Sequence, residues 1–121
     1  MFSEKALHGV NNISKKIEFI ENIVKEKGGI YKALEDEQNS RAAILMHITS
    51  IAEQFDKLLH SGEIEVLSYF EKEDIKGSYE LRNFIAHNYE GVDLYIVEDV
   101  IKERLPIIKK ETVHNSVSCN F

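Results

Sequence analysis

Apolar side chains recur at helical spacing along most of the chain. The first stripe has the i, i+4, i+7, i+11 spacing of a buried helix face, and consists of Ile13, Ile17, Ile20 and Val24. A helix is therefore predicted from Asn12, and Gly28-Gly29 ends it because glycine favours the left-handed backbone at helix C-termini. The residues before it, Met1 to Asn11, have weak periodicity and are expected to form a loose lead-in or a short extra turn.

The clearest stripe predicts a second helix, and it consists of Ile44, Ile48, Ile51, Phe55 and Leu58. Asn39 or Ser40 can cap its start, since both are residue types that satisfy free backbone amides at a helix N-terminus. Ser61-Gly62 interrupts the pattern and predicts the end of this helix.

Shorter elements are predicted next. Glu63 to Phe70 has enough apolar residues for a two-turn helix, and the mixed charges of Glu71 to Gly77 indicate a connector. A further helix is predicted from Ser78, with Gly91 as its stop. Its buried positions recur at i, i+3 and i+4, and are Leu81, Phe84 and Ile85.

The last helix is predicted to begin after Asp93, which can cap it. Val92 and Val97 are spaced to form a hydrophobic staple across that cap. Pro106 is expected to kink or restart the helix, because proline lacks an amide hydrogen. His114 to Phe121 is expected to be a loose tail.

Composition supports a helical fold of one domain. The chain has 121 residues, of which 43% are hydrophobic and 30% charged, and it contains one proline. This balance favours amphipathic helices over a turn-rich sandwich. We predict an all-α fold in which residues 1–121 form one antiparallel bundle of four main helices with a shorter helix inserted.

Several classes of protein are disfavoured. No apolar run approaches the roughly 20 residues that span a bilayer, and the start lacks a secretory signal, so a cytoplasmic protein without membrane contact is expected. Cys119 is the sole cysteine, which excludes an intramolecular disulfide. The net charge of −6 argues against indiscriminate nucleic-acid binding, so DNA is not expected as a partner and any RNA contact must be local. Common phosphate-loop, nucleophile-elbow and metal motifs are absent, and neither a metal nor a cofactor is predicted.

The candidate chemistry is concentrated between Tyr79 and Asp93. Arg82, Asn83, His87 and Tyr89 supply a fixed cation, an amide, a group that exchanges protons near neutral pH and a phenol. On a continuous helix, however, Arg82 and His87 are separated by about 140° around the axis. One helix therefore carries half a site, and a two-fold dimer would supply the second histidine that acid-base cleavage of RNA requires.

Spacing alone does not establish catalysis, because arginine and histidine five residues apart also occur in surface salt bridges and caps. His47 lies beside the second stripe without another histidine at ligand spacing, which favours an ordinary partly buried histidine over a metal ligand. Glu53 is acidic and adjacent to the apolar face. Its alternatives are a solvated helix residue and a side chain that lines the site.

The segment from Arg82 to Tyr89 resembles the Arg-x4-His-x-Tyr signature of the HepT family, toxins of the HEPN superfamily, and Asn83 fits the polar residue that follows the arginine. The resemblance covers roughly Ile13 to Lys110. It includes Arg41-Ala42-Ala43-Ile44, Ile51-Ala52-Glu53, Tyr89-Glu90-Gly91-Val92-Asp93 and Leu105-Pro106. Glu80-Leu81 stands where relatives often carry Gly-Met.

The resemblance implies a HEPN-type helical bundle that forms a homodimer and acts as a metal-independent endoribonuclease on RNA, with tRNA as one candidate. It implies catalytic roles for Arg82 and His87 and supporting roles for Asn83 and Glu53. It also implies a toxin of a type VII-like toxin-antitoxin system, neutralised by a minimal nucleotidyltransferase that binds it or adenylylates Tyr89. The alternative is a non-catalytic HEPN module that binds a nucleotidyltransferase or a nucleotide, which the acidic net charge favours.

Overall fold

The computed structural model describes the backbone of residues 2–119 and the side chains of residues 2–113. Within that range the chain is helical and has no strand. The elements are α1 (Glu4–Lys27), α2 (Ile30–Glu35), α3 (Ser40–His60), α4 (Ile64–Leu67), α5 (Lys72–His87), the 3-10 turn η1 (Tyr89–Gly91), α6 (Leu94–Asp99), the π-helical η2 (Val100–Arg104) and α7 (Leu105–Cys119).

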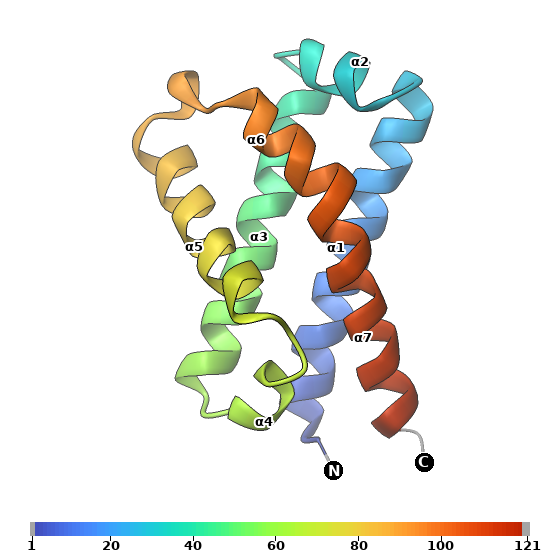
Figure 1. Cartoon of the computed structure of the whole chain (residues 1–121), viewed down its shortest axis with the longest axis vertical. Coiled ribbons are helices and arrows are strands. Elements are labelled where there is room, and N and C mark those ends of the chain that lie inside the picture. The colour runs from blue at the N-terminus through green and yellow to red at the C-terminus, as the bar shows by residue number, and fades with distance from the viewer. Residues whose placement is uncertain (1, 120–121) are drawn as a thin grey trace.

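The long helices run up and down the long axis of the molecule, as predicted (Figure 1). α1 and α3 are antiparallel neighbours, α5 packs on α3, and α6, η2 and α7 form one descending rod. α2 crosses one end of the bundle and α4 lies at the other. The prediction of an all-α bundle of this type is confirmed.

The two predicted stripes form the centre of the core. Ile13, Ile17 and Ile20 of α1 are fully buried, and the α3 stripe from Ile44 to Leu58 is at most 3% exposed. Phe55 of that stripe packs edge-on against Phe70, with ring centroids 5.1 Å apart. Burying a large side chain of this kind contributes about 1.5–3 kcal/mol. Gly28 ends α1 with a φ of 83°, as its sequence position predicts.

The predicted loose lead-in at the N-terminus is wrong. α1 begins at Glu4, and the Ser3 side chain caps it by accepting a hydrogen bond from the Ala6 amide. Ala6, Gly9 and Val10 are buried. Gly9 lies so close to Leu58 that an added Cβ would be 2.8 Å from a Leu58 methyl carbon. Small residues permit this close helix approach, but they give a weak hydrophobic signal in the sequence.

The predicted connector from Glu71 to Gly77 is also wrong. α5 begins at Lys72, and α4 is only one turn rather than two. Asp74 is buried and accepts hydrogen bonds from Arg104 Nε and Nη2 at 2.7 and 2.8 Å. Arg104 also bonds to Glu71. The carboxylate of Asp74 is neutralised by a residue 30 positions away, so the local charge pattern does not indicate its burial.

The C-terminal rod matches its predicted signals in part. Asp93 caps α6 by accepting a hydrogen bond from the Tyr95 amide at 2.9 Å, and Val97 is fully buried. The helix continues through Pro106, but its backbone widens into the π-helical η2 just before α7 begins. Proline lacks the amide hydrogen of a regular α-helical bond, which favours such a local change in helix geometry. The backbone of residues 114–119 continues α7, whereas a loose tail was predicted. The last two residues of that predicted tail lie outside the described range.

Candidate active site

The end of α5 carries the predicted histidine and tyrosine. His87 is the last residue of α5 and is exposed. The Asn88 amide donates to the Phe84 carbonyl at 2.8 Å and closes the helix. Tyr89 then begins η1, with 39% of its surface exposed. Both ring side chains are therefore accessible to a molecule that approaches this end of the bundle.

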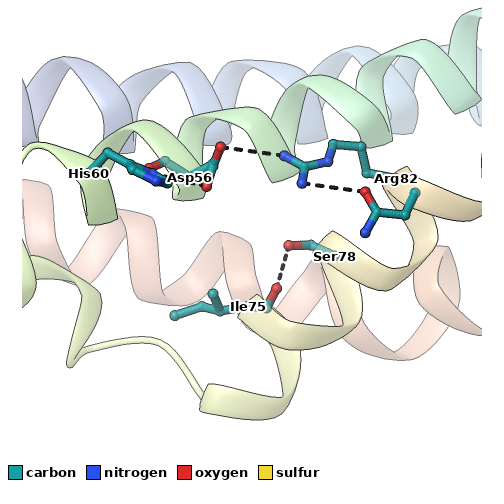
Figure 2. A network of polar contacts seen from close by, with 6 residues as sticks. Asp56, His60, Ile75, Ser78 and Arg82 are labelled. Atoms are coloured by element: carbon teal, nitrogen blue, oxygen red, sulfur yellow. Dashed lines mark hydrogen bonds and ion pairs between the residues drawn. The ribbon is translucent and has the colours of Figure 1, made fainter. Parts of the chain in front are cut away.

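Arg82 lies one and a half turns earlier on α5 and faces α3. Its Nη1 is 3.6 Å from Asp56 Oδ2, and Nη2 is 3.5 Å from Asn83 Oδ1. The guanidinium carbon is also 5.4 Å from the centroid of the Tyr79 ring. The Arg82 side chain is 24% exposed, so it is held on three sides and still reaches solvent. Figure 2 shows the ion pair between Asp56 of α3 and Arg82 of α5.

Asp56 contacts both Arg82 and His60. Its Oδ1 is 3.2 Å from His60 Nδ1, while its Oδ2 points toward Arg82. His60 lies one turn after Asp56 on α3, and its Nδ1 is also 2.9 Å from the Asp56 carbonyl oxygen. His60 and Arg82 contact different oxygens of this carboxylate. Asp56 is thus one of the residues that hold Arg82 in place, and it also contacts His60 (Figure 2).

The ring of Tyr79 packs against the guanidinium of Arg82. Its hydroxyl oxygen is buried and has no hydrogen-bond partner among the residues that the structure describes. Burial raises the pKa of this phenol, the charge of Asp56 raises it further, and Arg82 lowers it. An unbonded buried hydroxyl costs free energy.

Among the described residues, no hydrogen bond or ion pair joins Arg82 to His87 within one chain. Arg82 contacts Asp56 of α3, whereas His87 is the exposed last residue of α5. No hydrogen bond or ion pair of His87 is present in the described part of the chain. A single copy therefore presents a cation and a proton-exchanging group on different sides of one helix.

Comparison with known families identifies the family of the chain. A family model described as "Ribonuclease HepT-like" matches residues 13–114, which is most of the chain. The chain belongs to the HepT-like ribonuclease family. No curated protein matches it significantly, and no solved structure does either.

Membership of this family agrees with the helical bundle, and the matched residues include the segment from Arg82 to Tyr89. Among the described helices, none is long and apolar enough to cross a membrane. Within the same residues, no group of three or more histidine, cysteine or acidic side chains is arranged to hold a metal ion. His47 packs beside the Phe19 ring, with centroids 5.3 Å apart, and burial lowers its pKa.

The other predicted residue, Glu53, is exposed on α3 one turn before Asp56. Asp56, Tyr79 and His60 form the network around the arginine of this HepT-like chain, and the sequence did not single them out. Asp56 is 26 positions from Arg82, and it occupies an ordinary polar position of an amphipathic helix. The only available signal was its place four residues before His60 on the same helix.

Proposed function

We propose that this HepT-like chain is an endoribonuclease toxin that cleaves RNA without a metal, with Arg82 and His87 as its catalytic residues. The observation that supports this most directly is the family match, which includes the complete Arg82, His87 and Tyr89 set. The accessibility of His87 and the partial exposure of Arg82 agree with contact to a large substrate.

The proposed reaction is an internal transfer at phosphorus. A base removes the proton of the 2′-hydroxyl, and the 2′-oxygen forms a bond to phosphorus as the bond to the 5′-oxygen breaks. An acid gives a proton to the departing 5′-oxygen, which leaves a 2′,3′-cyclic phosphate and a 5′-hydroxyl. Arg82 binds the phosphoryl oxygens, whose charge increases in the transition state. His87 exchanges the protons, and Asn83 orients the phosphate or the histidine.

The site is proposed to be complete only in a homodimer. The reaction needs both a base and an acid, whereas one chain offers one histidine near the end of α5. A two-fold axis beside the exposed end of α5 would bring two copies of His87 into one cleft. Glu53, which is exposed on α3, would then line the edge of that cleft.

Tyr89 is the proposed point of control. A partner nucleotidyltransferase would direct the phenol oxygen onto the α-phosphorus of ATP, releasing pyrophosphate and the phenolic proton. The new phosphodiester adds a negative charge and considerable bulk beside His87, which repels the RNA backbone and fills the cleft. The exposure of Tyr89, 39%, agrees with access for such an enzyme.

Cleavage of a labelled RNA by the purified dimer tests the proposal. We expect His87→Ala and Arg82→Ala to abolish cleavage while their helical circular dichroism and melting temperature stay near those of the wild type. His8→Ala is the matched control, because His8 is an exposed histidine on α1 far along the chain from the motif. Unchanged cleavage by His87→Ala would exclude the assigned role.

A second candidate function is a non-catalytic module that binds a nucleotidyltransferase or a nucleotide, and the net charge of −6 favours it. It is supported if the wild-type dimer leaves cellular RNA and tRNA intact but forms a tight complex with a nucleotidyltransferase. Both functions predict a dimer, so sedimentation alone does not separate them.

A further inference from the structure

A groove lies between α5 and the rod formed by α6, η2 and α7. Its volume is about 730 Å³, and its floor reaches Ile48 and Ile51 of α3. Leu81 and Phe84 form the wall on α5, and Ile96 and Val100 form the opposite wall. Phe84 and Ile96 are 48% and 53% exposed. Apolar side chains of a binding partner are buried favourably in an apolar groove.

This groove lies away from the network around Arg82. Gly77, Leu81 and Phe84 recur along the groove face of α5, whereas Arg82 faces Asp56 of α3. The catalytic role proposed above uses none of the residues that form its walls. A molecule bound in the groove would therefore be something other than the scissile phosphate.

The rim of the groove is acidic. Glu73 and Glu80 of α5 line it and have no ion-pair partner among the described residues. Arg104, the basic residue of the lining, is already paired with Asp74 and Glu71. The free charge around the apolar floor is negative, which repels RNA and attracts lysine or arginine side chains.

Gly77 makes room for a close approach. It lies inside α5, and a Cβ added to it would meet no atom within 4 Å. Glycine in a helix interior is unfavourable relative to alanine, and nothing in the chain itself requires it here. A partner backbone that packs on this face of α5 would use the space that the missing side chain leaves.

We propose that the groove binds a cationic amphipathic helix of a partner protein, with its apolar side chains against the exposed Phe84 and Ile96 and its basic residues on Glu73 and Glu80. This binding mode is the helix-in-groove type. Two copies of this chain that docked through the groove about a two-fold axis would bring the same acidic rim to both sides. Like charges would then oppose that contact, so a basic partner fits better than a second copy.

A fluorescence anisotropy titration with the full chain tests this. The probe is a labelled synthetic helix of leucine and lysine with one apolar face, and its control is a scrambled peptide of equal charge and composition. We expect the amphipathic peptide to bind at least about tenfold more tightly than the scrambled one, because only the former presents an apolar face.

Two variants identify the groove as the site. Gly77→Leu fills the open space, and the double exchange Glu73→Lys, Glu80→Lys reverses the rim charge. Each is expected to weaken the amphipathic peptide at least about tenfold, since the first blocks the groove and the second repels lysine. Glu26→Lys on α1 is the charge control and is expected to have no comparable effect.

Equal binding of both peptides, or equal effects of Glu26→Lys and the rim variant, would show non-specific attraction and overturn the proposal. Loss of the homodimer in Gly77→Leu, observed by sedimentation, would overturn it in favour of a second copy in the groove. These measurements need no RNA cleavage, so they distinguish failure of this proposal from failure of the proposed nuclease activity.

Discussion

Asp56→Asn removes the carboxylate that lies 3.6 Å from Arg82 Nη1 while keeping nearly the same side-chain shape. Arg82 then keeps its contacts with Asn83 and the Tyr79 ring, at 3.5 Å and 5.4 Å. The exchange therefore loosens the guanidinium without emptying the site. If Arg82 acts on the phosphoryl oxygens from its present position, the variant should cleave RNA more slowly.

The structure sets the size of this effect. The Arg82 and Asp56 side chains are 24% and 39% exposed, and pairs of this kind contribute about 0.2–1 kcal/mol. Stability should therefore fall by about 1 kcal/mol at most, and the same amount lost in the transition state lowers kcat about fivefold. The lost charge has an opposite effect on binding. In water, a carboxylate about 7 Å from a phosphate opposes the binding of that phosphate by about 0.6 kcal/mol. Removing the Asp56 charge should therefore lower KM about two- to threefold.

Steady-state cleavage of a fluorogenic RNA measures both constants for the wild type, Asp56→Asn and the charge control Glu26→Gln. An unchanged or increased kcat in Asp56→Asn would refute the reasoning, because Asp56 would then not hold Arg82 in its active position. Ultraviolet titration gives a readout independent of activity. The pKa of Tyr79, identified by comparison with Tyr79→Phe, should fall in Asp56→Asn because Asp56 raises it.

Three further predictions concern the fold and the modification. Gly9→Val should lower the free energy of unfolding in urea by about 2–3 kcal/mol, since its side chain would overlap Leu58, whereas Gly77→Val has open space and should be nearly neutral. His47 has a lowered pKa in the folded state, so the unfolded chain binds more protons and stability should fall as pH decreases below the ordinary value of 6.5; in His47→Gln that dependence should be smaller, and an equal pH slope would contradict it. Coexpression with a genomically neighbouring nucleotidyltransferase should add one or more AMP masses, and Tyr89→Phe should lose that gain in intact-mass spectrometry; its persistence would place the modification elsewhere.

The sequence predicted those parts of the fold whose signal is local. The stripe from Ile44 to Leu58, the glycine stop at Gly28 and the Asp93 cap depend on neighbouring residues, and the structure confirms each. Gly9 was missed because close packing of small residues leaves no apolar period. The start of α5 was missed because Asp74 is compensated by Arg104 of η2, a contact that forms only after the chain folds.

The candidate site likewise has residues that a local motif predicts and residues that only the tertiary packing brings together. The motif places Arg82, His87 and Tyr89 on one segment, and helix periodicity alone predicts that the first two diverge. Asp56 and Tyr79 could not be identified, because their effect on Arg82 depends on how α3 packs against α5. The groove could not be predicted from the sequence either, because its lining comes from five separate elements, α3, α5, α6, η2 and α7.

The most direct test of the central claim is a mixing experiment between the wild type and His87→Ala. The two proteins are allowed to exchange subunits at constant total concentration, and RNA cleavage is measured against the fraction of wild type. If the site needs His87 from both copies, activity falls with the square of that fraction, to about one quarter in an equal mixture. A linear decrease to about one half would contradict the shared site, and intact RNA with pure wild type would contradict the nuclease activity itself.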